Sequence, residues 1–477
     1  MSVPTRASVL GSLFVALVIG VAAVLGFGAA SRYPAAAATP VVFSCVQVLF
    51  PRVRFNSASA LSPLAWASYT FGLQLVVVPL LVAFFGPTQE TLPWLPSDAA
   101  INGALLLQAL AYIAFACGVA LQRSHYEVSL AAIGNLNPTT ITGLVGVGLI
   151  GVAARFGSPQ GLIAYATGHG PLPTFVTDPT AHATLAQAAS DFLLPCLGFG
   201  LAAIICRYAD RFQARELLRL HKLIVITTLV ALLVGASALY EYNRASIFVP
   251  VAALAAAWSL RKRRIPYSLL LAAGLVGFVV FLQLGSFRDT YYRTVGGTLD
   301  PSQVALQPID PVRTIQVYSN GPQFLAFALE NSPQGSPFWG GSLIASALSP
   351  VPVIGRNFRN QSGTTIYNNL IYGAGIAYDQ IIPFHAELMW NFGIVGLPLG
   401  FFALGLVVSQ IDRRFRASPT ILRAYIWQFW GIWCAFLIVG APGILAQVLV
   451  YSLPPMVIGL VSTRILQSQS RAGVVNS

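Results

Sequence analysis

The sequence has few charged residues and no paired-cysteine motif. Only 9% of its 477 residues are charged, whereas 56% are hydrophobic, and globular domains usually carry about 25% charged residues. This composition argues against a soluble enzyme, a disordered chain and a coiled coil. Because no cysteine forms a Cys-x-x-Cys pair or a cluster with histidine, we predict no disulfide, zinc site or thiol chemistry. The cysteines are Cys45, Cys117, Cys196, Cys206 and Cys434.

The apolar residues occur in long runs, which predict an all-α, polytopic membrane protein. A spanning helix needs about 20 mostly apolar residues. The candidate spans are 8–28, 35–50, 64–85, 100–121, 138–154, 184–206, 223–239, 246–260, 266–285, 386–409, 424–440 and 443–462. The first run is longer than the apolar core of a signal peptide, about 7–15 residues. A retained first helix is therefore favoured over a cleaved signal peptide.

Acidic residues are also scarce, and the net charge is +12. In a membrane protein, basic residues gather in cytoplasmic loops, so this charge indicates topology rather than nucleic-acid binding. With the N-terminus inside, twelve spans place most of the basic residues, both lysines included, in inner loops. We therefore expect a multi-pass cell-membrane protein with both termini cytoplasmic. The arginines left outside are Arg32, Arg155, Arg244, Arg288, Arg293, Arg313, Arg356 and Arg359.

One long outer segment separates the ninth and tenth predicted spans. We expect three regions: nine transmembrane helices within 1–285, an extracytoplasmic loop over 286–383, and a C-terminal region, 384–477, with three more helices and a cytoplasmic tail. Long loops without structure of their own are uncommon and usually functional. Apolar residues recur along Pro311–Glu330 with helical spacing. We expect short helices that lie on the outer membrane face and cover a cavity.

Two arginines and two tyrosines follow the ninth span. Arg288 and Arg293 can bind phosphate oxygens in a bidentate manner, and Tyr291 and Tyr292 can donate a hydroxyl or stack on a sugar. The alternative is an interfacial belt of tyrosine with anchoring arginine. We favour a binding function, because the arginines stand on the side where positive charge is rare.

Three further arginines lie in predicted outer turns. Arg244 precedes the eighth span, where it is either a phosphate ligand beside a helix N-terminus or the partner of Glu241. Arg356 and Arg359 stand among Asn and Gln side chains, which suits an oligosaccharide or a phosphate, although a solvated loop would look the same.

The start of the tenth span carries ionisable groups at membrane depth, where they are costly and usually functional. His385 and Glu387 stand there, and Asn391 follows Glu387 by one helical turn. The alternative is a carboxylate that complements the helix dipole. His-Ala-Glu is not a metal motif. Asp191, inside the sixth span, is expected to form a structural pair with an outer arginine rather than to act in catalysis.

A family resemblance covers this same region. A Gly-rich segment, 373–379, runs into His-Ala-Glu-Leu-Met-Trp-Asn-Phe-Gly-Ile-Val-Gly, 385–396. With the long loop before it, the pattern resembles the Wzy-type oligosaccharide repeat-unit polymerases of O-antigen and capsule. Glu387, Asn391, Phe392, Gly393 and Gly396 match their motif. The family's usual Gly/Ser-Arg turn appears only as Asn243-Arg244-Ala245-Ser246.

The resemblance implies a membrane glycosyltransferase of the C type. Such an enzyme would join undecaprenyl-diphosphate-linked units at the outer face of the bacterial cytoplasmic membrane, with inversion and without metal or cofactor. Arg288 would stabilise the leaving diphosphate, and Glu387 would be the general base with His385 as its competitor. A flippase and a chain-length regulator are the implied partners, and nucleic acid is not. The alternatives are a glycan ligase of the same architecture and a transporter, which should show discontinuous helices in two matching halves.

Overall fold

The computed structural model describes residues 32–50, 53, 60–122, 135–166, 185–213, 216, 219–239, 244–262, 265, 272, 274, 277, 310–352, 354–373 and 381–475. These described residues form helices and no strands. The chain divides into two compact units. Unit 1 comprises 1–126, 310–414 and 430–447, and unit 2 comprises 127–309, 415–429 and 448–477.

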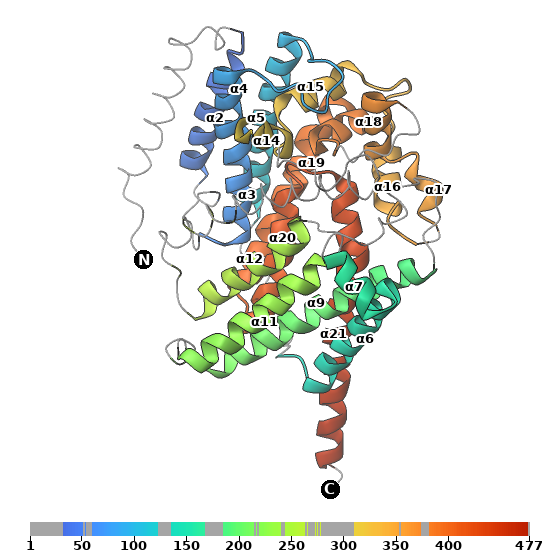
Figure 1. The fold of residues 1–477 in the computed structure, drawn as a ribbon. Helices are drawn as coiled ribbons and strands as arrows, with labels where there is room; N and C mark the ends of the chain where they lie inside the picture. The colour runs from blue at the N-terminus through green and yellow to red at the C-terminus, as the bar shows by residue number, and fades with distance from the viewer. Residues whose placement is uncertain are drawn as a thin grey trace. The chain divides into compact units, whose positions relative to one another are not determined.

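Figure 1 shows the helices in chain order. Their bounds are α2 Ala35–Leu49, α3 Pro63–Gly72, the π-helix η1 Leu73–Val77, α4 Val78–Phe85, α5 Asp98–Leu121, α6 Pro138–Phe156, α7 Pro159–Ala166, α9 Leu185–Arg211, α11 Leu220–Ala238, α12 Arg244–Arg261, α14 Pro311–Tyr318, α15 Pro322–Glu330, α16 Gly341–Leu348, α17 Arg356–Arg359, α18 Gly363–Tyr372, α19 Phe384–Arg416, α20 Ile421–Phe436 and α21 Pro442–Val475.

Among the described residues, seven helices are long and apolar enough to cross a membrane. They are Pro63–Phe85, Asp98–Leu121, Pro138–Phe156, Ser190–Arg211, Leu220–Ser237, Phe384–Arg416 and Pro442–Leu466. Ala35–Leu49 and Ala245–Arg261 are apolar but shorter. The expectation of an all-α membrane protein is therefore met. The predicted span 8–28 lies outside the described residues, as does nearly all of 266–285.

Unit 1 has one end at which the loop segments meet the spanning helices. At the start of α5, the Ser97 N–H donates a hydrogen bond to Glu330, and Arg32 donates one to Asp98. Gln316 of α14 bonds to Gly86, just after α4. We call this the loop end. At the opposite end, Asp412 accepts a hydrogen bond from the Leu64 N–H, and Gln122 donates to Gln410.

The segment 310–373 does not simply lie on a surface, which differs from the expectation for the long loop. Helix α15 is enclosed, because Phe324 to Ala328 all have 0% exposure. Glu330, the last residue of α15, accepts a hydrogen bond from Ser97. The carbonyl of Asn320, which lies just before α15, accepts one from Gln108. These contacts are ten or eleven residues apart along α5, which is about 15 Å. The stretch Pro311–Glu330, for which helical spacing was predicted, forms two helices that are separated at Asn320, where φ is +47°.

Helix α19 folds back on itself instead of crossing as one straight rod. Gly393 has φ 64° and ψ −162°, which is non-helical. The rings of His385 and Phe401 lie 4.5 Å apart, although residues sixteen positions apart in a straight helix are about 24 Å apart. A Cβ at Gly400 would likewise lie 2.5 Å from Leu388 Cδ1. Residues 384–392 therefore form a re-entrant limb and residues 394–416 a spanning limb.

The spanning limb has the length of a membrane crossing. At 1.5 Å per residue it extends about 34 Å, and the hydrocarbon core of a bilayer is about 30 Å thick. Ile394, Val395 and Leu399 on this limb are exposed. The re-entrant limb is instead buried over most of its length, with Phe392 beside the break exposed, and non-standard backbone at membrane depth needs such burial in protein.

Unit 2 is held together by close packing of α6 against α9. A Cβ at Gly148 would lie 2.4 Å from Leu197 Cβ, and one at Gly151 would lie 2.7 Å from Leu193 Cβ. The same pair of helices carries an ion pair, because Arg155 Nη1 lies 3.1 Å from Asp191 Oδ1. The expected pairing of Asp191 with an arginine is therefore confirmed.

Candidate functional site

The re-entrant limb places Glu387 inside unit 1, between helices α16 and α18. Its side chain has 0% exposure. Oε1 accepts hydrogen bonds from Ser346 Oγ at 2.7 Å and from Ser342 Oγ at 3.4 Å. Figure 1 shows that α16, α17 and α18 lie together. The carboxylate therefore ties the loop helices to the limb.

The N-terminus of α18 also meets the carboxylate. Gly363 begins this helix, and its N–H donates to Ser346 Oγ at 3.2 Å. A Cβ at Gly363 would lie 2.5 Å from Glu387 Oε1, so only glycine fits without displacement. Helix N-termini favour negative charge. Ser346 and the N-terminus of α18 therefore both lie against one oxygen of the buried carboxyl group.

Asn391 completes the polar cluster one turn after Glu387. Its Nδ2 donates to Ser342 Oγ and to the Glu387 carbonyl, both at 2.7 Å. Among the described residues, neither Asn391 Oδ1 nor Glu387 Oε2 has a hydrogen-bond partner. Buried polar atoms nearly always have one. These two oxygens are therefore the ones that can accept from a bound hydroxyl or water.

The break at Gly393 is stabilised by the loop rather than left open. Because the helix is broken there, the carbonyls of Trp390 and Asn391 take hydrogen bonds from outside the helix. Phe338 N–H donates to the Trp390 carbonyl at 2.8 Å, and Trp339 N–H donates to the Asn391 carbonyl at 3.0 Å. The Asn-Phe-Gly segment is thus the turn of the hairpin.

His385 does not join Glu387. Its ring packs on Phe401 of the spanning limb, and its side chain has 0% exposure. Residues two apart on a helix do not share a face. Among the described residues, neither ring nitrogen has a hydrogen-bond partner. The structure therefore brings Glu387 and Asn391 together and separates His385 from them.

The predicted arginines divide into three groups. Arg356 and Arg359 form α17, which is exposed and directly precedes α18. The Arg359 carbonyl accepts from Ser362 Oγ at 2.8 Å, and Ser362 caps α18. Arg244 begins α12, in unit 2, and its side chain is not among the described ones. Arg288, Tyr291, Tyr292 and Arg293 lie outside the described residues.

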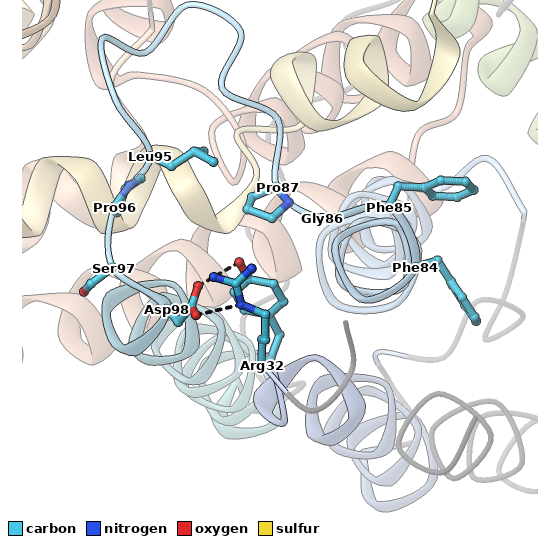
Figure 2. Close-up of a pocket in the computed structure, with 10 residues that line it drawn as sticks. Arg32, Phe84, Phe85, Gly86, Pro87, Leu95, Pro96, Ser97 and Asp98 are labelled. Atoms are coloured by element: carbon cyan, nitrogen blue, oxygen red, sulfur yellow. Dashed lines mark hydrogen bonds and ion pairs between the residues drawn. The ribbon is translucent and has the colours of Figure 1, made fainter. Parts of the chain in front are cut away.

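Two clefts open at the loop end of unit 1, apart from Glu387. The first has a volume of about 670 Å³ and includes Arg32, Tyr33 and Asp98 in its lining. Figure 2 shows Arg32 and Asp98 meeting in this cleft, whereas the rings of Phe84 and Phe85 project away from them. Arg32 Nε donates to Asp98 Oδ2 at 3.0 Å, and Tyr33 donates to Oδ1 at 2.9 Å. Burial and the Asp98 bond raise the pKa of Tyr33 to about 12.

The second cleft shares the wall Phe85–Pro87 and has a volume of about 500 Å³. Thr88, Asp310, Arg313 and Gln316 contribute to its lining. Asp310 caps α14, and Arg313 lies 3.6 Å from Glu90. In the second cleft, the charge of Arg313 is thus offset by Glu90, and that of Asp310 by the N-terminus of α14.

Sequence reasoning missed the residues that hold Glu387. Ser342, Ser346 and Gly363 stand in short loop helices and belong to no motif. It also missed Gln74 and Gln108, which are fully buried. Their signal was present, because each is a lone amide inside an otherwise apolar span. Within the described residues, no group of three His, Cys, Asp or Glu side chains could hold a metal ion.

Comparisons with known proteins gave no relative. No family model matches the chain, and neither a curated protein nor a solved structure matches it. Function is therefore inferred from the residues and their geometry.

Proposed function

We propose that the protein polymerises undecaprenyl-diphosphate-linked oligosaccharide units at the outer face of a bacterial cytoplasmic membrane. One observation carries the proposal. Glu387 is buried within a re-entrant helix, with Oε1 held by Ser346 and with Oε2 unpartnered among the described residues. The resemblance to repeat-unit polymerases includes this residue and the Asn-Phe-Gly turn beside it. The distribution of arginines along the sequence supports an outer location for the loop end.

The proposed reaction is one inverting displacement. The acceptor hydroxyl attacks the anomeric carbon of the donor glycan, and the bond from that carbon to the diphosphate oxygen breaks. Glu387 Oε2 takes the hydroxyl proton, and the lipid diphosphate leaves with the bonding electrons. Arginines stabilise the charge that develops on the diphosphate. Arg288 and Arg293 have this role in the proposal, and Arg356 and Arg359 bind from α17.

Because Glu387 is enclosed, substrate access requires α16 and α18 to move apart. Ser346 then releases Oε1, and the polar cluster opens towards the exposed α17. A site that closes after binding excludes water from the reaction. In this proposal the cluster is the closed, resting arrangement.

The test is a reconstitution of the full chain in liposomes with labelled undecaprenyl-diphosphate-linked oligosaccharide. The wild type should yield a ladder of products. Glu387→Gln keeps the shape of the side chain and should lower the rate by about 10²–10⁴-fold, the usual contribution of a general base. The matched control Glu90→Gln removes an exposed carboxylate at the same end. A ladder at the wild-type rate from Glu387→Gln would refute the base assignment.

One observation favours a transporter as the second candidate. Discontinuous helices are typical of transporter binding sites, and α19 is broken at Gly393. A transporter would move the labelled lipid across the liposome membrane and make no ladder. A ligase would make no ladder from lipid-linked units alone, but would transfer the glycan once a different acceptor is added.

A further inference from the structure

Buried polar side chains form a column through unit 1 that neither the proposed polymerase nor Glu387 uses. It begins at Gln316, which lines the second cleft. Gln323 Nε2 donates to Gln316 Oε1 at 3.2 Å, and Gly321 N–H donates to the Gln316 carbonyl at 2.9 Å. Asn320 stands beside Gly321, and its carbonyl accepts from Gln108 Nε2 at 3.5 Å.

The column continues to the base of the re-entrant limb. Asn320 Nδ2 donates to the Val439 carbonyl. The next carbonyl, that of Gly440, accepts from Phe384 N–H at 3.0 Å. His385 follows Phe384 directly. A run of hydrogen bonds and adjacent residues thus leads from the cleft to the backbone that directly precedes the buried His385.

Each polar side chain inside the column is underbonded. Gln323, Gln108 and His385 have 0% exposure and Asn320 has 3%. Gln323 Oε1, Gln108 Oε1, Asn320 Oδ1 and both nitrogens of His385 have no hydrogen-bond partner among the described residues. A buried polar group without a partner typically costs about 1–3 kcal/mol. Five such atoms on one route indicate a polar ligand that bonds to several of them.

We propose that water molecules bind along this column and form a proton path from the second cleft to His385. A buried water typically makes about three hydrogen bonds to otherwise unsatisfied groups, and the route supplies five such atoms. Each proton passes from one water to the next. The imidazole takes a proton at one nitrogen and returns it at the same or the other nitrogen, so no atom or electron is gained or lost.

The path is independent of the proposed polymerase. Glu387 lies on a different face of the limb, bonded to α16, and shares no hydrogen bond with the column. The chemistry that defines this site is neutral and amide-rich, with a single titratable group at its inner end. It therefore suits water and protons rather than a phosphate or a metal ion.

Deuterium exchange at the imidazole C2 position, read by mass spectrometry of the full chain in D₂O, tests the path. His221 is exposed and serves as the internal reference. In the wild type, His385 should exchange measurably despite its burial. Gln108→Leu and Gln323→Leu should each slow the exchange at His385 by about tenfold, the factor for one lost buried hydrogen bond, and leave His221 unchanged. Gln122→Leu, at the other end of α5, is the matched control and should leave both unchanged.

Two results would overturn the path. One is a wild-type His385 that does not exchange while His221 exchanges fully. The other is an unchanged His385 rate in both leucine variants. Thermal unfolding decides the case in which a variant folds poorly. A variant whose Tm falls well below that of Gln122→Leu is set aside, and the exchange rate of His385 in the wild type and in the other leucine variant decides.

Discussion

Replacing Gly363 with alanine is the sharpest test of the Glu387 cluster. The new Cβ would lie 2.5 Å from Oε1, whereas ordinary contacts of a Cβ begin at 3.4 Å. The carboxylate must therefore withdraw by about 0.9 Å. A shift of that size stretches the 2.7 Å bond from Ser346 beyond hydrogen-bond distance. Overpacking together with a lost charge-assisted bond predicts a destabilisation of about 2–4 kcal/mol.

The assay is thermal unfolding of the purified chain in detergent at a fixed scan rate. For a folding unit of 150–250 residues, 1 kcal/mol corresponds to about 2–4 °C, so Gly363→Ala should lower Tm by roughly 5–15 °C. Gly103→Ala is the matched control, because a Cβ there meets nothing within 4 Å. Adding Glu387→Asp shortens the acid and should recover part of the loss. Equal Tm values for Gly363→Ala and Gly103→Ala would refute the contact.

Three further predictions address the hairpin and unit 2. Gly393→Ala forces a side chain into a backbone conformation that is essentially restricted to glycine, so it should cost about 1–3 kcal/mol, visible as a lower Tm; an unchanged Tm would contradict the turn. In a chain whose native cysteines have been replaced, Leu388→Cys and Gly400→Cys together should form a disulfide that mass spectrometry of the digested protein detects. A straight helix would hold the two positions about 18 Å apart, and absence of the disulfide would contradict the hairpin. Asp191→Asn and Arg155→Gln should show a coupling of about 1–3 kcal/mol in a double-mutant cycle of unfolding, and additive effects would mean that the pair contributes nothing.

The spanning helices were predictable because hydropathy alone determines them. The structure places long apolar helices on the predicted spans 64–85, 100–121 and 138–154, each starting or ending within two residues of the prediction. The Asp191 pair was predictable for a related reason, since a carboxylate inside a span needs a partner. The apolar face assigned to Pro311–Glu330 was real, but Phe324 to Ala328 carry no polar residue on any side. That pattern indicates an enclosed helix rather than a surface one.

The hairpin in α19 was not predictable from the same signals. Both limbs are apolar, so a hydropathy window passes over Gly393 without a change. The decisive feature is that Phe338 and Trp339, more than fifty residues earlier, supply the N–H groups that the break requires. The partners of Glu387 were hidden for the same reason, because Ser346 and Gly363 meet it only after the loop has folded into the unit.

The placement of Glu387 joins stability to activity in one group. A buried carboxylate is tolerated only where donors and a helix N-terminus offset its loss of water, and Ser342, Ser346 and α18 provide these. The same contacts leave Oε2 free of partners among the described residues. A residue kept only as a structural anchor would be replaceable by glutamine with little effect on either property. Under the proposed chemistry, Glu387→Gln should instead separate the two, with Tm close to that of the wild type and the rate of polymerisation strongly reduced.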